Sequence, residues 1–188
     1  MPGLTAQAII VVLPAVLSMS TNKTIPSDYQ PEIMFMKLQQ KDKAPDFNTA
    51  DQNGNKVSLK DFKGKKLALY FYPHDDTETC TKEACNLRDN YALLQQKGIE
   101  IVGVSIDDEK SHKKFEKKYS LPFTLLVDTE KKIVNGYGVW GEKLFMGKTI
   151  VSTYRTTFLI NEKGRIDHII EKVISKNHAQ QILDTWGL

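Results

Sequence analysis

The chain has 188 residues, of which 40% are hydrophobic and 26% are charged, and its formal net charge is +3. These values are typical of one globular domain with enough chain to bury a core. Two cysteines in a chain of this size exclude a disulfide-stapled secreted scaffold. The lysine cluster at 110–118 has interleaved acids, so it predicts a solvated helix face rather than a nucleic-acid site.

The N-terminal segment contains an apolar run at 8–17, which has the length of a signal-peptide core. The run is too short for a convincing membrane span, and Pro14 interrupts it. No basic residue precedes Lys23, so the charged start of a signal peptide is missing.

We therefore predict that residues 1–35 are a leader, disordered or signal-like, or a mis-assigned start, and that one domain spans 36–188. No stable membrane association is expected. The expected location is the cytoplasm, with export as the alternative if residues 1–20 act as a signal peptide.

Apolar runs and turn residues predict an alternation of strands and helices along the domain. Strands are expected where short apolar runs are bounded by turns, at 65–72, 99–106, 123–127, 156–160 and 166–170. Helices are expected after capping residues or where apolar residues recur at helical spacing, at 80–96, from 107 or 108 to 119, from 129, and at 177–186. This order predicts an α/β fold with a mixed central sheet and helices on both faces. No glycine-rich phosphate loop follows a strand, so no nucleotide site is expected.

The only two cysteines, Cys80 and Cys85, lie just after the predicted strand at 65–72. Apolar residues from Cys85 to Leu94 recur at helical spacing, so Cys80 is placed where a strand ends and a helix begins. The free N–H groups and the dipole of a helix N-terminus stabilise negative charge. They therefore favour the thiolate of Cys80, which is the reactive form of the side chain.

The spacing of the two cysteines limits when they can bond. Positions five apart on a regular helix differ by about 140° in direction and about 7.5 Å in rise. Their Cα atoms lie roughly 8–9 Å apart, beyond the limit of about 7 Å for a disulfide. Cys80 and Cys85 therefore either never bond or bond when the first turns of the helix unwind. For Cys85 alone, a small apolar residue on the buried helix face and a redox partner are equally good interpretations.

Three other functions remain as alternatives for the cysteine pair. A redox-sensing module would use the same disulfide as a switch without turnover. A metal site could use Cys80, Cys85 and His74, but structural zinc wants four ligands and the sequence offers no second ligand pair. A domain of this α/β fold without chemistry would leave Cys80 unreactive. We expect neither a metal nor a cofactor.

Short motifs around the cysteines resemble a known family. Pro73, Thr77 and Cys80 match the Pro-x-x-x-Thr-x-x-Cys motif of peroxiredoxins. The run from Cys80 to Asp89, with its second cysteine, resembles the bacterioferritin comigratory protein, or peroxiredoxin Q, subfamily. The resemblance extends from about residue 38 to the C-terminus. It includes the family's entry segment at 44–47 and its later loop at 137–143 and 146–148. It also includes the segment at 154–160, which carries the family's active-site arginine.

The resemblance implies a thioredoxin-like fold and a thiol-dependent peroxidase. Cys80 would be the peroxidatic cysteine, which attacks a peroxide oxygen and becomes a sulfenic acid. Cys85 would be the resolving cysteine, which forms an intramolecular disulfide that a thioredoxin-type reductant then reduces. Thr77 would offer its hydroxyl to the thiolate or the peroxide, and Pro73 would shape and shield the pocket. Arg155 would stabilise the thiolate and the charge that moves onto the leaving oxygen.

Arg155 is the assignment that the residues alone do not favour. An arginine in an extended segment usually faces solvent or pairs with an acid, and the resemblance alone places this one in the site. The expected substrates are hydrogen peroxide and organic hydroperoxides, and the expected state is a monomer or weak dimer that binds no nucleic acid.

Overall fold

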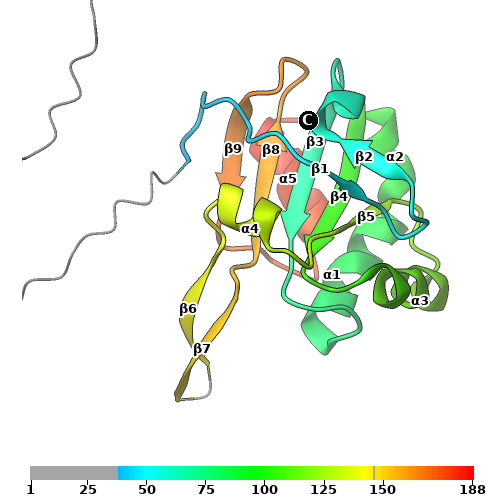
Figure 1. Cartoon of the computed structure of the whole chain (residues 1–188). Coiled ribbons are helices and arrows are strands. Elements are labelled where there is room, and N and C mark those ends of the chain that lie inside the picture. The colour runs from blue at the N-terminus through cyan, green and yellow to red at the C-terminus, as the bar shows by residue number, and fades with distance from the viewer. Residues whose placement is uncertain (1–37, 146) are drawn as a thin grey trace, which may run out of the picture. The chain divides into compact units, whose positions relative to one another are not determined.

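A five-stranded sheet forms the centre of the part of the chain that the computed structural model describes, residues 38–145 and 147–188. Its strands follow the order β5-β4-β3-β8-β9 (Figure 1). The sheet is mixed, because β3, β4 and β5 run parallel to one another, whereas β8 is antiparallel to both of its neighbours, β3 and β9. Their bounds are β3 (Lys66–Phe71), β4 (Ile99–Ser105), β5 (Thr124–Val127), β8 (Thr156–Ile160) and β9 (Ile166–Ile170). The predicted mixed sheet is confirmed.

Helices and two small hairpins complete the fold. The helices are α1 (Glu78–Asp89), α2 (Tyr91–Gln96), α3 (Glu109–Tyr119), α4 (Lys132–Gly136) and α5 (His178–Trp186), with a 3-10 helix η1 (Leu59–Phe62) before β3. The hairpins lie outside the main sheet and pair β1 (Asn48–Ala50) with β2 (Lys56–Ser58), and β6 (Trp140–Phe145) with β7 (Lys148–Thr153).

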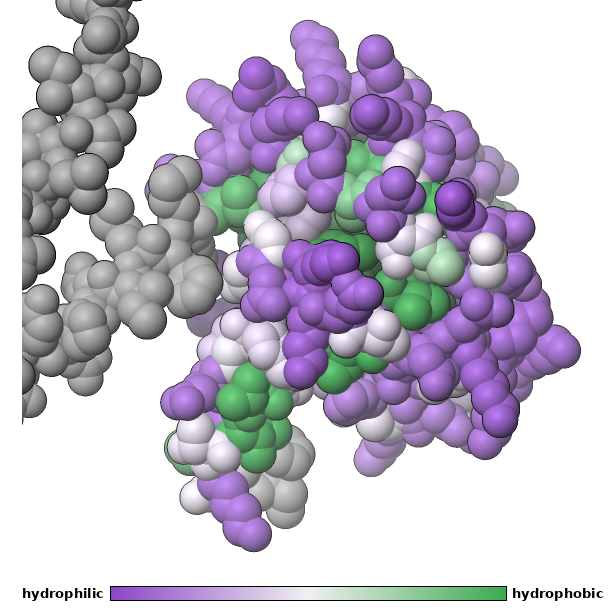
Figure 2. Space-filling model, in the orientation of Figure 1, coloured by the Kyte–Doolittle hydropathy of each residue, from purple (hydrophilic) through white to green (hydrophobic). Residues whose placement is uncertain are grey.

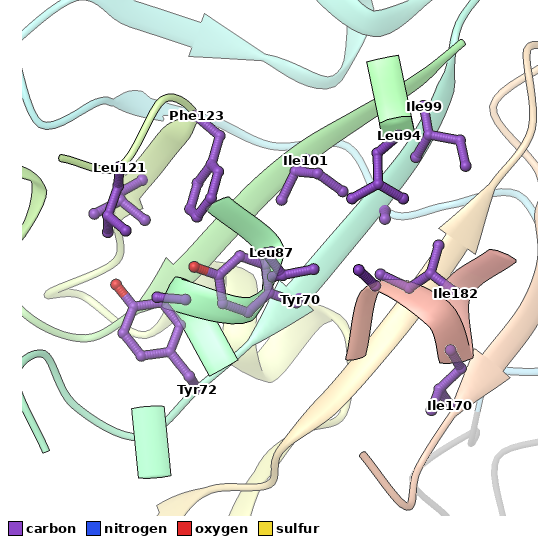
Figure 3. Close-up of a cluster of buried hydrophobic side chains, with 14 of the residues drawn as sticks. Tyr70, Tyr72, Leu87, Leu94, Ile99, Ile101, Leu121, Phe123, Ile170 and Ile182 are labelled. Atoms are coloured by element: carbon purple, nitrogen blue, oxygen red, sulfur yellow. The ribbon is translucent and has the colours of Figure 1, made fainter. Parts of the chain in front are cut away.

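Side chains alternate along β3 and supply a core on each face of the sheet. Tyr70 and Tyr72 point to the face covered by α1, α2, α3 and α5. Leu69 and Phe71 point to the opposite face, which packs against α4 and the segment from β1 to η1. Figure 3 shows part of the first core, where side chains of β3, β4, α1, α2 and α5 meet. Helical cover on both faces is thus confirmed as well.

One predicted helix is two helices in the structure. The helix expected over 80–96 is α1 followed by α2, with Asn90 between them. Asn90 has φ −107° and ψ 10°, and its Nδ2 donates to the carbonyl of Asn86 at 2.9 Å. An asparagine side chain that bonds to nearby backbone competes with the helical hydrogen bonds, which explains the break. The remaining predicted helices are present, and Asp108 caps α3 by accepting from the backbone N–H of Ser111 at 2.8 Å.

The β6–β7 hairpin stands where the resemblance predicted a loop. Its two strands pair along their length, and Gly147 adopts a φ of +77° in the turn, a conformation that favours glycine. Met146, which the resemblance also placed in that loop, lies outside the described residues. The hairpin projects from the central sheet (Figure 1), and Figure 2 shows hydrophobic side chains on it. The exposed apolar side chains that the structure describes on it include Leu144, Ile150 and Val151.

The predicted leader, residues 1–35, lies outside the described residues, as does the expected domain start at Met36. Among the residues that the structure does describe, no helix is both long enough and apolar enough to cross a membrane.

Gly103 in β4 generates a prediction about stability. A Cβ atom added there would lie 2.7 Å from the Cζ and Oη atoms of Tyr70 and 2.9 Å from Cδ2 of Leu125. We expect Gly103→Ala to lower the free energy of unfolding by about 1–3 kcal/mol, because these buried side chains cannot move without repacking the core. Gly136→Ala is the matched control, since a Cβ atom there would meet only Pro45 at 3.9 Å. Equal denaturation midpoints for the two variants would contradict this account of the core.

Candidate active site

Cys80 lies in the first turn of α1, after the loop that leaves β3, as the sequence predicts. The helix begins there because Thr77 takes the extended conformation of an N-cap residue, with φ −81° and ψ 152°. Cys80 shares the buried face of α1 with Ala84 and Leu87, and only 2% of its surface is exposed. The sulfur therefore lies at the polar start of a helix and is shielded from bulk water.

Arg155 reaches the sulfur from the opposite side of the site. It lies in the short link between β7 and β8, and its Nη2 donates to Sγ of Cys80 at 3.1 Å. A guanidinium at this distance stabilises negative charge on the sulfur. The structure thus brings together the two residues that the resemblance placed in the site.

Glu83 holds the other end of the same guanidinium. Its side chain is fully buried, and its Oε2 accepts a hydrogen bond from Nη1 of Arg155. Burial lowers the pKa of Arg155, but the negative charges on Glu83 and Cys80 together outweigh this effect and raise the pKa above its usual value. Arg155 therefore stays charged, with its two Nη atoms divided between a carboxylate and the sulfur.

His178 continues the contacts behind Glu83. Its Nδ1 lies 3.0 Å from Oε1 of Glu83, although the angle there is not that of a hydrogen bond. Its Nε2 lies 2.9 Å from Oγ1 of Thr157 in β8. Sequence reasoning missed Glu83 and found no role for His178. The position of Glu83 on the apolar face of a predicted helix could have indicated its role, because a buried carboxylate needs a cation as its partner.

Thr77 and Pro73 lie on the loop between β3 and α1. The Thr77 hydroxyl donates to the carbonyl of His74 at 3.2 Å, and its side chain is exposed. Pro73 is half-buried directly after the strand. Among the described contacts, neither residue has a hydrogen bond to the sulfur of Cys80, so their roles at the site stay predictions.

The loop that carries Thr77 is fixed to α3 by a buried carboxylate. Asp75 accepts hydrogen bonds from the hydroxyls of Tyr72 and Ser111, each at 2.8 Å. Nδ1 of His112 lies 2.9 Å from the same carboxylate, and Nε2 of His112 lies 3.1 Å from the carbonyl of Leu126. Both ring nitrogens of His112 therefore lie within hydrogen-bond distance of oxygen atoms, one on the loop and one on β5.

A second carboxylate of the loop makes the same connection at the surface. Asp76 has a φ of +55°, and its carboxylate accepts from Nζ of Lys118 at 2.7 Å and from the hydroxyl of Tyr119 at 2.6 Å. These hydrogen bonds lower the pKa of Asp76. The loop before Cys80 is therefore held at two successive residues by one neighbouring helix.

Cys85 lies farther along α1 and is half-buried, and both cysteines are free. The helix that contains them is continuous from Glu78 to Asp89. Both cysteines therefore lie on one intact helix. In that arrangement, their spacing predicts that the two sulfurs cannot bond.

An open groove of about 660 Å³ borders Arg155 on the side away from α1. Most of its lining is apolar and comes from the base of the β6–β7 hairpin and from β8 and β9, including Tyr137, Val139, Phe158 and Ile169. Lys143 also lines it and donates to the carbonyl of Thr153 at 3.1 Å. Burial and then the charge of Arg155 lower the pKa of Lys143. Cys80 is not among the lining residues, so the groove adjoins the site through Arg155.

A metal site was one alternative from the sequence. Within the described ranges, no group of three or more His, Cys, Asp or Glu side chains has an arrangement that could hold a metal ion.

Comparisons with known proteins identify the family of the chain. Residues 41–169 match the AhpC/TSA family. The chain is 41% identical over 143 residues to peroxiredoxin Bcp of Escherichia coli strain K12, across 76% of this chain and 92% of the relative. It is 43% identical over 143 residues to peroxiredoxin Bcp of Bacillus subtilis strain 168, across 76% of this chain and 91% of the relative. A solved structure of the Xanthomonas campestris bacterioferritin comigratory protein matches with a TM-score of 0.70 at 29% identity, over 75% of this chain and 90% of that chain.

The family match covers most of the chain, and the relatives are matched over nearly their whole length. The structural match gives the mixed sheet and its helices a thioredoxin-like peroxiredoxin fold. The chain therefore belongs to the AhpC/TSA family of peroxiredoxins and, within it, to the Bcp or peroxiredoxin Q subfamily of thiol peroxidases.

Proposed function

We propose that this peroxiredoxin reduces hydrogen peroxide and organic hydroperoxides through a sulfenic acid on Cys80 and an intramolecular disulfide between Cys80 and Cys85. A thioredoxin-type reductant returns the disulfide to two thiols. The observation that carries the proposal is the hydrogen bond of 3.1 Å from Arg155 to the sulfur of Cys80 at the start of α1.

In the first step, the Cys80 thiolate attacks one oxygen of the peroxide. An S–O bond forms and the O–O bond breaks, so the cysteine becomes a sulfenic acid and the other oxygen leaves as an alkoxide or hydroxide. That oxygen takes a proton and departs as an alcohol or water. Arg155 lowers the barrier because its positive charge faces the thiolate first and the leaving oxygen afterwards.

Thr77 and Pro73 complete the peroxide pocket in this proposal. The Thr77 hydroxyl donates a hydrogen bond to the carbonyl of His74. The lone pairs of its oxygen can therefore accept a hydrogen bond from the peroxide. Pro73 has no backbone N–H and a fixed φ, so it shapes the loop and shields the pocket without offering a competing donor.

In the second step, the Cys85 thiol attacks the sulfur of the Cys80 sulfenic acid. An S–S bond forms and one water leaves, which makes the disulfide. The intact α1 keeps the sulfurs apart, so its first turns must unwind before this step. Two thiols of a reductant then reduce the disulfide by exchange.

The apolar groove beside Arg155 supports the inclusion of organic hydroperoxides. Its lining side chains can accept the hydrocarbon part of a substrate while the peroxide group faces Arg155. The Xanthomonas campestris relative is described in connection with alkyl peroxide reduction. The cytoplasmic location and the monomeric or weakly dimeric state stay predictions.

Replacing each cysteine tests the chemistry. We expect Cys80→Ser to lower peroxide consumption by at least about a thousandfold, because the nucleophile is lost. Cys85→Ser should keep the first oxidation, seen by mass spectrometry as one added oxygen on Cys80, and lose recycling by thioredoxin. A coupled assay with thioredoxin and its reductase measures both variants. Full turnover by Cys80→Ser would refute the proposed function.

A second prediction concerns the backbone of α1. After one equivalent of peroxide forms the disulfide, amide hydrogens in Glu78–Asp89 should exchange at least about tenfold faster than in the reduced protein, because the first turns have opened. The amides of α3 are the internal control. Hydrogen exchange followed by mass spectrometry makes the comparison, and unchanged protection in α1 of the oxidised protein would count against the unwinding step.

A further inference from the structure

We propose that His178, the first residue of α5, is a positioning residue of the peroxidase site. It fixes the carboxylate of Glu83, which in turn fixes the guanidinium of Arg155 against Cys80. This inference rests on the proposed function and deepens it, because it adds the C-terminal helix to a site otherwise built from α1 and the link before β8.

The first support is the burial of two facing polar atoms. His178 and Glu83 are both 0% exposed, and Nδ1 of His178 lies 3.0 Å from Oε1 of Glu83. Among the described residues, neither atom has another hydrogen-bond partner. A buried polar atom without a partner is strongly unfavourable, so these two atoms are each other's partners after a small rotation of the ring.

The second support is the chemistry of the donors and acceptors. Glu83 accepts from Arg155 through Oε2, so Oε1 belongs to an ionised carboxylate and needs a donor. Nδ1 of His178 must then carry a proton. Nε2 faces the hydroxyl of Thr157 at 2.9 Å, and a hydroxyl can donate to that nitrogen. The tautomer with its proton on Nδ1 thus gives a partner to both ring nitrogens of His178 and to Oε1 of Glu83.

The third support is that the position of the ring is itself fixed. The ring of Tyr70 lies edge-on to the His178 ring, with centroids 6.2 Å apart. The start of α5 is tied to α1 by Asn86, whose Oδ1 accepts from the backbone N–H of Ala179 at 2.8 Å. Nδ2 of Asn86 donates to the carbonyl of Lys176 at 3.0 Å. The helix that carries Glu83 therefore also sets the location of His178.

The two oxygens of the Glu83 carboxylate therefore have different partners: Oε2 pairs with Arg155 and Oε1 with His178. Arg155 alone would leave one oxygen of Glu83 unpaired and free to rotate toward any other donor. With Oε1 held by His178, the carboxylate plane is set, and Nη2 of Arg155 is directed at the sulfur. His178 does not touch the sulfur, so its effect reaches the reaction through Glu83 and Arg155.

Two variants separate positioning from simple structural support. The amide nitrogen of an asparagine can take the place of Nδ1, and the amide of a glutamine can take the place of Nε2. His178→Asn therefore keeps the donor toward Glu83 and gives up Thr157, whereas His178→Gln does the reverse. We expect His178→Gln to slow oxidation of Cys80 by roughly tenfold to a hundredfold, and His178→Asn to stay within about threefold of wild type.

Each variant gives up one buried polar contact, so the melting temperature of each is measured alongside its rate. The rate is measured by stopped-flow competition for hydrogen peroxide in full-length protein. Alkylation of Cys80 by iodoacetamide, in a Cys85→Ser background, reports the reactivity of the sulfur without any peroxide. The proposal would be overturned if the oxidation and alkylation rates of the Asn and Gln variants were equal. It would also be overturned if these rates followed only the melting temperatures.

A double-mutant cycle gives the second test. In a Glu83→Ala background no carboxylate joins His178 to Arg155, so His178→Gln should slow alkylation by less than about twofold further. An equal effect in both backgrounds would show that His178 acts independently of Glu83 and would sink the inference. Absence of peroxidase turnover in the wild type would defeat the proposed function instead, and the alkylation cycle would still decide the role of His178.

Discussion

The burial of the Glu83 carboxylate is the constraint on which the rest of the site depends. A carboxylate with no access to water needs a cation, and removing one partner from such a pair costs about 3–5 kcal/mol. Arg155 is that cation, and Glu83 and Cys80 lie on the same buried face of α1. The helix therefore places the sulfur next to any guanidinium that pairs with Glu83. One ion pair thus both neutralises the buried carboxylate and places a guanidinium against the sulfur.

The loop before the helix is held by a separate set of charges. Asp75 and Asp76 connect it to α3, one through His112 in the interior and the other through Lys118 at the surface. This arrangement fixes the start of α1 from outside the helix. The N-cap conformation of Thr77 then does not depend on a side-chain cap, and Thr77 makes none to the backbone of the helix. Its hydroxyl can thus serve a substrate rather than the helix.

Local patterns predicted most of the fold and part of the site. Apolar runs gave the five central strands, and the strand-to-helix junction gave the position of Cys80, because both are set by residues close in the sequence. The break at Asn90 was missed, since a side-chain hydrogen bond to the backbone leaves little trace in periodicity. Arg155 entered through family resemblance alone. His178 could not be found at all, because its partner lies on another helix and no spacing in the sequence joins them.

In the proposed disulfide cycle, the interruption at Asn90 would limit how much of the molecule must change on oxidation. The helix that carries both sulfurs ends at Asp89, and α2 begins at Tyr91 after Asn90, whose φ of −107° and ψ of 10° are not helical. Leu94 of α2 is fully buried against the same core as β4. Melting that starts at the catalytic end can therefore stop at a boundary already present in the reduced protein. In the proposed cycle the unwinding would then be confined to one short helix, while the sheet and its packing would remain in place for the return to the reduced form.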